Sequence, residues 1–141
     1  MRGVYTLILF LEDDLEVGKW RLGKGIYCYT GSGMSNLLAR VKRHFRREKK
    51  VKWHIDLMTT ESNVAVLGAV VAESDERMEC KVNKELEKVG KVIRGFGNTD
   101  CKEGCRGHLV KGVDLSTLME IYRNLGLEPL IWDNGIIKVL N

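Results

Sequence analysis

The chain has little of what marks a disordered, secreted or membrane-spanning protein. It contains one proline, no low-complexity tract and no internal repeat. The longest apolar run, Val4 to Leu11, is far shorter than the ~20 residues that cross a bilayer. Because Glu12, Asp13 and Asp14 follow that run, it does not predict a signal peptide either. These absences favour a cytoplasmic chain that does not contact a membrane.

What is present suits one globular domain. Hydrophobic residues make up 44% of the chain and charged residues 30%, a balance typical of proteins with a packed core. A length of 141 residues is enough to bury such a core without disulfides. We therefore expect a single domain over residues 1–141. The four cysteines are too few for the disulfide framework of a small secreted protein.

Positive charge is concentrated between Arg40 and Lys52. That segment holds eight Lys or Arg residues and one acid, Glu48, so its net charge is +7 in a chain whose total is +4. Such a cationic block on a slightly acidic body predicts a polyanion site. The alternative is a solvated helix face, on which interleaved acids would be expected. The cations expected to contact nucleic-acid phosphates, beside Arg40, are Lys42, Arg43, Arg46, Arg47, Lys49, Lys50 and Lys52.

Hydrophobic patterning in the first half predicts strands around one helix. Val4–Leu11 and Ile26–Thr30 are expected to pair as a long hairpin, and Val64–Ala72 reads as a central strand. Apolar and polar residues alternate over residues 51–58, which predicts a half-buried strand. Residues 35–47 predict an amphipathic helix with a serine N-cap at its first position.

The second half predicts two helices and a hairpin. One helix starts at Ser74 or Asp75 and stops at Gly90, and another follows Asp114. Residues 130–132 and 136–140, joined by an Asp-Asn-Gly turn, predict a β-hairpin. The expected fold class is α/β (α+β): one mixed, mostly antiparallel sheet flanked by helices. The apolar residues expected to face inward from the first of these helices are Met78, Val82, Leu86 and Val89.

The helix over residues 35–47 carries the strongest functional signal. Arg40, Arg43, His44 and Arg47 recur at three- and four-residue spacing, so they form one stripe beside the apolar face. Guanidinium groups match phosphate oxygens, and a histidine can exchange a proton near neutral pH. The pattern favours phosphate binding. In the alternative, the arginines only keep the helix soluble and His44 lies at its boundary.

An ordered set of motifs resembles the GIY-YIG endonucleases. Gly3-Val4-Tyr5 and Tyr29-Thr30-Gly31 resemble the two signature tripeptides of that family, and Arg40 with His44 resembles its Arg-x-x-x-His element. Glu79 follows the apolar strand, where the family carries a metal-binding glutamate. The order strand, strand, helix, strand, helix also resembles the family layout.

Further segments resemble the Uri-type branch of small archaeal and bacterial proteins: residues 29–33, 53–56, 79–80, 96–101 and 108–109. This resemblance implies a core over residues 1–109 and a C-terminal extension over 110–141. Tyr5 and Tyr29 are 24 positions apart, a wider spacing than the family usually shows, which implies an insertion around Trp20. Gly25-Ile26-Tyr27 also spells the first signature, but Tyr27 lies on the same predicted strand as Tyr29 and so cannot supply its partner strand.

The resemblance implies a metal-dependent nuclease that hydrolyses phosphodiester bonds of DNA, with RNA as the alternative substrate. Tyr29, with Tyr5 beside it, would help deprotonate the attacking water, and Glu79 would hold one Mg²⁺ or Mn²⁺. Arg40 would neutralise the scissile phosphate. His44 would orient this network or protonate the leaving oxygen.

Several alternatives stay open. Glu73 and Glu85 are rivals to Glu79 as the metal ligand. His54 and Asp56 share one face of the predicted strand, where they form either a second layer around the site or an exposed ion pair. Three cysteines and a histidine could bind a structural zinc ion, although a disulfide or buried thiols are favoured over zinc; these residues are Cys80, Cys101, Cys105 and His108.

Two other functions compete with cleavage. The chain could bind nucleic acid without hydrolysing it, or it could act as an accessory protein partner of a DNA repair enzyme. The sequence does not indicate an oligomeric state.

Overall fold

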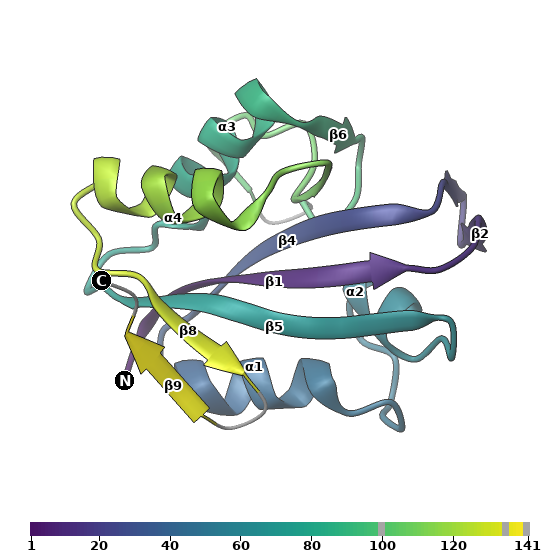
Figure 1. The fold of residues 1–141 in the computed structure, drawn as a ribbon, viewed down its shortest axis with the longest axis horizontal. Helices are drawn as coiled ribbons and strands as arrows, with labels where there is room; N and C mark the ends of the chain where they lie inside the picture. Colours follow the sequence, from purple (N-terminus) through teal and green to yellow (C-terminus); the bar gives the residue numbers. More distant parts are fainter. Residues whose placement is uncertain (99–100, 134–135, 140–141) are drawn as a thin grey trace.

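Three long strands form the centre of the sheet in the computed structural model, which describes residues 1–98, 101–133 and 136–139 (Figure 1). β1 (Gly3–Leu11) pairs antiparallel with β4 (Gly25–Gly33) on one side and with β5 (Val64–Glu73) on the other. The predicted long hairpin is thereby confirmed. The insertion expected around Trp20 is a small hairpin of its own, β2 (Leu15–Val17) and β3 (Trp20–Leu22).

Among the described residues, seven strands make up the main sheet, in the order β6-β7-β4-β1-β5-β8-β9. All pairings within the described part of the chain are antiparallel, which confirms an α+β fold with a mostly antiparallel sheet. The predicted C-terminal hairpin is β8 and β9, although its turn at residues 134–135 and residue 140 lie outside the described residues. The outer strands are β6 (Lys91–Ile93), β7 (Leu109–Lys111), β8 (Leu130–Asp133) and β9 (Ile136–Val139).

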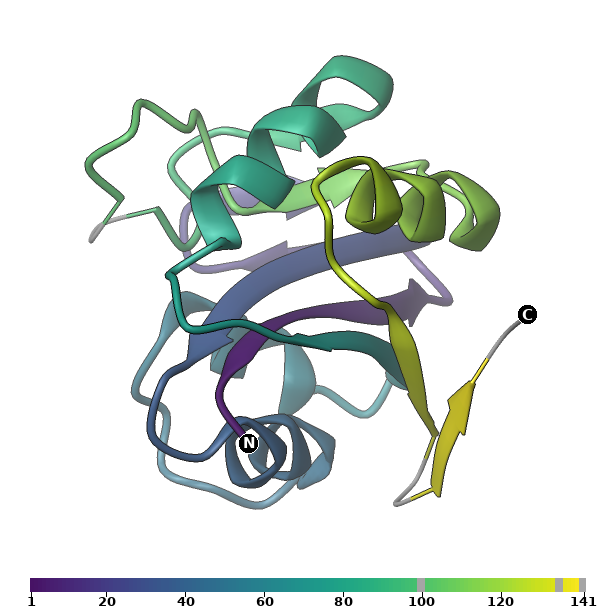
Figure 2. The same cartoon turned by 90° about the vertical axis from the view of Figure 1, so that its left-hand side faces the viewer.

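Helices cover both faces of this sheet (Figure 2). α1 (Leu37–Phe45) and α2 (His54–Thr59) pack on one face, and α3 (Glu79–Val89) and α4 (Leu115–Asn124) pack on the other. Side chains alternate across a strand, so β1 contributes to a separate hydrophobic core on each side of the sheet. This explains why β1 is apolar along nearly its whole length. No helix in the described part of the chain is both long and apolar enough to cross a membrane.

The predicted strand over residues 51–58 is wrong, because this segment contains α2. The Asp56 carboxylate accepts hydrogen bonds from the backbone N–H groups of Lys52 and Trp53, and these bonds fix the first turn of a helix. Ile55 and Met58, three residues apart, then face the core. A short alternation of apolar and polar residues therefore did not decide the local structure.

The other helices differ from their predictions only at their ends. α1 is capped by Asn36, one residue after the predicted cap, and its side chain accepts a hydrogen bond from the Ala39 N–H. α3 begins at Glu79 because Ser74 instead closes a tight turn through its hydroxyl, which accepts from Glu76 N–H. Gly90 ends α3 as predicted, but Val89 is 53% exposed, so its predicted inward orientation is wrong.

Candidate active site

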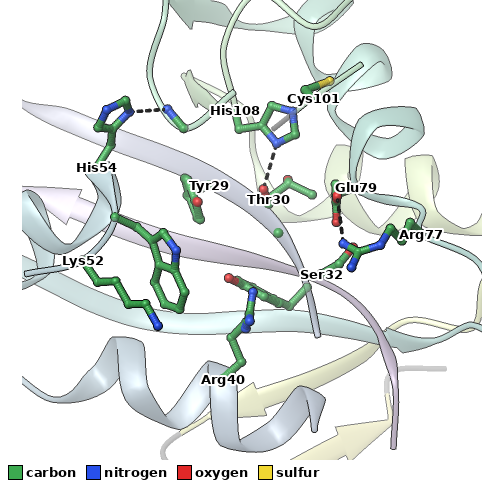
Figure 3. Close-up of a pocket in the computed structure, with 14 residues that line it drawn as sticks. Tyr29, Thr30, Ser32, Arg40, Lys52, His54, Arg77, Glu79, Cys101 and His108 are labelled. Carbon is green, nitrogen blue, oxygen red and sulfur yellow. Dashed lines mark hydrogen bonds and ion pairs between the residues drawn. The ribbon is translucent and has the colours of Figure 1, made fainter. Parts of the chain in front are cut away.

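A pocket of about 340 Å³ opens at one edge of β4, where the neighbouring strand β7 ends (Figure 3). β7 pairs with β4 only from Tyr27 to Tyr29, so among the described residues Gly31–Gly33 pair with β1 alone. Side chains from both faces of the sheet meet around this open edge. We call Tyr5, Tyr29, Arg40, Trp53 and His54 the core wall, and Arg77, Glu79, Cys101 and His108 the loop wall.

Glycines let the two tyrosines lie at the pocket. Tyr5 on β1 stands opposite Gly31 on β4, and a Cβ added at Gly31 would lie 2.5 Å from the phenolic oxygen. Tyr29 lies against Gly97 in the same way, since a Cβ there would come within 2.7 Å of its ring. Gly97 also has a φ of 71°, a conformation that side chains rarely adopt.

His44 supports Tyr5 from behind and does not line the pocket. Its Nε2 lies 2.7 Å from the Tyr5 hydroxyl, and its Nδ1 has no hydrogen-bond partner within the described part of the chain. Burial, with Lys49 nearby, lowers the pKa of His44 to about 3, so the imidazole is uncharged at neutral pH. This corrects the expectation that His44 exchanges a proton near neutral pH.

Tyr5 stays protonated in this environment. The side chain is almost fully buried, and burial together with the neighbouring Tyr29 raises its pKa well above the usual value. Arg40 opposes this shift without reversing it. Tyr5 is therefore a phenol that donates or accepts hydrogen bonds, with His44 as its fixed partner.

Trp53 supports the arginine that reaches the pocket. The guanidinium of Arg40 lies 4.9 Å from the centre of the Trp53 ring, and that of Arg43 lies 4.4 Å from it. Cation–π contacts of this kind restrict a long side chain without taking up its N–H donors. Patterning marked Trp53 only as an apolar strand residue, so its contact with Arg40 was not foreseen.

Arg43 and Lys49 are held inside the fold rather than offered to a phosphate. Arg43 donates two hydrogen bonds to Asp56, of 2.7 and 2.9 Å, and Lys49 donates to the backbone oxygens of Arg43 and His44. Burial raises the pKa of Asp56, but the bonds from Arg43 and the backbone outweigh it and lower the pKa to about 2. Arg47 is also engaged, with the carbonyl of Glu61. These contacts occupy the donors of Arg43 and Lys49 and correct the expectation for these two cations, whereas Arg47 is exposed and its expected role stays a prediction.

His54 and Asp56 do not form a pair. His54 lines the pocket, and its Nδ1 accepts a hydrogen bond of 2.9 Å from the Gly97 N–H, so a neutral ring carries its proton on Nε2. Asp56 lies behind the pocket and acts through Arg43. Of the two expected arrangements, the exposed ion pair is excluded.

Glu79 supplies the only carboxylate among the residues that line this pocket in the described structure (Figure 3). Burial raises its pKa, and the neighbouring Arg77, His108 and Arg40 oppose this. Its Oε2 is buried and has no hydrogen-bond partner among the described residues, and the same is true of Ser32 Oγ in the same pocket. Unpartnered buried oxygens fit a cation or a donor that enters the pocket.

The rival glutamates lie elsewhere. Glu73 is exposed at the end of β5, and Glu85 forms an ion pair of 2.7 Å with Lys88 on the outside of α3. Neither lines the pocket. The sequence did not single out Ser32 or Arg77, because a hydroxyl next to glycines and an arginine before a helix are common features.

Three cysteines and a histidine gather beside the loop wall, with ligand atoms within 4.8 Å of one another; they are Cys80, Cys101, Cys105 and His108. All four cysteines of the chain are free thiols, so of the two favoured alternatives to zinc, a disulfide or thiols, the structure has the thiols. Burial raises the pKa of Cys101, but hydrogen bonds from Cys80 and His108 outweigh it and lower the pKa to about 6. This cluster could hold a metal ion.

An exposed basic surface continues from the pocket along the segment after α1. A second hollow, of about 570 Å³, lies there. Its cations include Arg46, Lys50 and Lys52, and Lys52 also lines the first pocket. Lys42 is exposed on α1. Of the predicted phosphate contacts beside Arg40, these four and Arg47 are exposed.

Comparison with known proteins places the chain in a family. Residues 4–128 match the family model described as a domain of unknown function, DUF123, and the protein belongs to that family. The match runs from β1 to just beyond α4, so it includes both walls of the pocket and the cysteine cluster. No curated protein and no solved structure matches the chain.

Proposed function

We propose that this protein is a metal-dependent nuclease that hydrolyses phosphodiester bonds in DNA, with a site of the GIY-YIG type. One observation carries the proposal. A guanidinium and a partly buried carboxylate, Arg40 and Glu79, enter one pocket from different walls (Figure 3), and two tyrosines line the same pocket. Phosphodiester hydrolysis needs such a cation for the phosphate and such an anion for a metal ion.

The buried, unpartnered Oε2 of Glu79 fits Mg²⁺ or Mn²⁺, because these ions take oxygen ligands and keep most of their waters. When bound, such an ion adds positive charge and lowers the pKa of water. Arg77, whose Nη1 lies 3.8 Å from Glu79, is exposed and can turn toward a phosphate. Arg40 binds the phosphate from the opposite wall.

The tyrosines and His44 have the remaining roles in the proposed reaction. Tyr29, 9% exposed, is closer to solvent than Tyr5 and orients the attacking water. Tyr5 keeps its proton and holds the hydrogen-bond network together, with His44 as a positioning residue behind it. Because the imidazole of His44 is neutral and outside the pocket, protonation of the leaving oxygen is assigned to solvent or to His54.

The exposed cations beside the pocket supply affinity without sequence preference. Lys42, Arg46, Lys50 and Lys52 lie where the flanking backbone of a nucleic acid would pass. Contacts of this kind weaken steeply as salt rises, with a slope in log K of roughly −0.9 per phosphate neutralised on duplex DNA. DNA is preferred to RNA as the substrate because of the family resemblance, and the free thiols suit a cytoplasmic location.

A nuclease assay with matched variants tests the proposal. Supercoiled plasmid and branched DNA are incubated with Mn²⁺ and either wild-type protein or the double variant Arg40→Ala/Glu79→Ala. The control is Arg123→Ala/Glu85→Ala, which removes the same charges from α4 and from the outer side of α3. The first variant is expected to lose at least ~100-fold in rate and the control to keep its rate. Equal cleavage by wild type and the first variant would refute the proposal.

A second candidate function is supported by the basic surface outside the pocket. That surface could bind nucleic acid without hydrolysis, alone or as an accessory to a DNA repair enzyme. Salt-dependent binding with no cleavage in Mn²⁺ or Mg²⁺ would favour this function. Binding whose affinity does not change with salt concentration would instead indicate a protein partner.

A further inference from the structure

The cysteine cluster, Cys80, Cys101, Cys105 and His108, lies against the pocket and has no part in the chemistry proposed above. We propose that these four residues bind one Zn²⁺ as a closed structural site, and that this ion fixes the loop wall of the pocket. The proposal does not depend on the nuclease activity, because it concerns metal content and local order.

The spacing of the ligand atoms suits a tetrahedral ion. Zn–S bonds of ~2.3 Å and Zn–N bonds of ~2.1 Å place neighbouring ligand atoms ~3.5–3.8 Å apart. The distance from Cys80 Sγ to His108 Nε2 is 3.8 Å, and all four ligand atoms lie within 4.8 Å of one another. Cys80 Sγ and Cys101 Sγ are 2.7 Å apart, so the two thiols would separate by about 1 Å around the ion.

His108 is oriented as a zinc ligand usually is. Its Nδ1 lies 3.1 Å from the backbone oxygen of Thr30, which can only accept, so Nδ1 carries the proton. The lone pair on Nε2 therefore points toward the sulfur of Cys80. Metal-bound histidines almost always donate their second N–H to a carbonyl or carboxylate in this way.

The ligand set selects zinc and a structural role. Three thiolates and one imidazole are soft ligands, which favour Zn²⁺ over Mg²⁺ or Ca²⁺. Four protein ligands complete a tetrahedral shell and leave no open position for substrate. Cys80, Cys105 and His108 are each less than 10% exposed, so the ion would be shielded from water.

The site joins three segments of the chain. Cys80 follows Glu79 in the first turn of α3, His108 directly precedes β7 and contacts β4, and two ligands come from the intervening loop. Cys101 and His108 line the pocket themselves. An ion bound here would set the position of Glu79 relative to Thr30 and β4.

Metal analysis of the full-length chain, purified reduced and without a metal-binding tag, tests the first part. One Zn²⁺ per chain is expected by mass spectrometry. Cys105→Ser and His108→Gln are expected to lose stoichiometric zinc, and Cys28→Ala, a buried thiol outside the cluster, to keep it. A poorly folded variant would lose zinc for that reason alone, so a measurement on the wild-type protein is also needed. After exchange of zinc for Co²⁺, the wild-type protein should show the visible absorption bands of tetrahedral thiolate ligation.

Three results would overturn the site: no zinc in folded wild-type protein, unchanged zinc in Cys105→Ser, or a Cys80–Cys101 disulfide in protein purified under reducing conditions.

Hydrogen exchange tests the second part, that the ion orders the loop wall. After zinc removal, peptides from 94–108 and the first turn of α3 should exchange at least tenfold faster, while β1 should not change. Equal exchange with and without zinc would show that the ion does not order this wall.

Discussion

The two walls of the pocket are held in place by different forces. The core wall rests on buried structure: Tyr5 is part of the central strand, and Trp53 precedes a helix whose first turn is fixed by Asp56. The loop wall rests on polar contacts of a loop with α3. Asn83 donates to the carbonyl of Gly107 at 2.6 Å, and Glu87 pairs with Arg106 at 2.9 Å.

This difference predicts different sensitivities. The core wall depends on buried groups that must keep one charge state. A change of pH that alters this charge state, or a change in packing, should therefore disturb the core wall. The loop wall depends on thiols, and under the zinc proposal it should respond to chelators and oxidants instead. Reagents that disturb one wall should leave the other ordered.

The largest effect is expected from acid, through His44. Its pKa is about 3 in the folded protein, against about 6.5 in an unfolded chain. As pH falls below about 6.5, the unfolded chain therefore binds a proton at His44 that the folded chain does not bind. This group alone should lower the free energy of unfolding by about 4 kcal/mol between pH 6.5 and 3, measured by urea denaturation at a series of pH values.

His44→Gln is the control for this decline. It removes the titrating group while keeping a hydrogen-bonding side chain near Tyr5. Between pH 6.5 and 4 its stability should change less with pH than that of the wild type, since the pKa of Asp56 is about 2 in the folded protein and 3.8 in an unfolded chain, so its contribution is lost mainly below this range. Parallel curves for the two proteins would contradict the neutral, buried state of His44.

Asp56→Ala should be the most damaging single change to the core wall at neutral pH. It leaves the Arg43 guanidinium and the N–H groups of Lys52 and Trp53 without their acceptor. Removal of one partner from a buried pair costs about 3–5 kcal/mol, measured as a lower denaturation midpoint. Asp75→Ala breaks the exposed pair with Arg2 and should change the midpoint little. Similar shifts in both variants would disprove the structural role of Asp56.

Gly31→Ala tests the fit of Tyr5. The added Cβ would overlap the phenol, so the tyrosine must move, at a cost of about 1–3 kcal/mol for overpacking. Under the nuclease proposal the rate falls as well, by at least tenfold. Gly23→Ala is the comparison, because the nearest atom to its Cβ would be the end of the long Lys111 side chain at 3.0 Å, with Asp14 at an ordinary 3.8 Å. Wild-type stability and rate in the Gly31→Ala variant would show that Tyr5 does not need this glycine.

Trp53→Leu should have the smallest effect. It removes the ring on which Arg40 rests, and an exposed cation–π contact contributes about 0.5–1 kcal/mol. DNA affinity or cleavage rate should fall roughly two- to fivefold, with the salt slope of binding unchanged because no charge is lost. A lower salt slope would mean that Trp53 organises more cations than Arg40 and Arg43.

Much of the fold followed from the sequence, because long apolar runs and helical periodicity depend on many residues at once. β1, β5 and the helices α1, α3 and α4 were predicted on that basis. α2 was missed because its six residues are too few to show a period. Its structure depends on the Asp56 carboxylate, whose choice of backbone partners is a local event that patterning does not capture.

The site was predictable in part. The order of elements was sufficient to bring Tyr5, Tyr29, Arg40 and Glu79 into one pocket, as expected from the resemblance. Which cations of the basic segment stay at the surface was not predictable, because Arg43 and Lys49 turn inward only once Asp56 is placed by α2. The cysteine cluster was anticipated from the spacing of Cys101, Cys105 and His108, but the sequence did not decide between a disulfide and the free thiols that the structure has.

Binding of Mn²⁺ tests the central claim most directly. Electron paramagnetic resonance would count the ions bound to the full-length protein in the presence of a short DNA duplex that carries non-hydrolysable linkages. One Mn²⁺ per chain is predicted for the wild type and for Glu85→Ala, and at least tenfold weaker binding for Glu79→Ala. Equal Mn²⁺ binding by the wild type and Glu79→Ala would contradict the assignment of this pocket as a metal-dependent phosphodiesterase site.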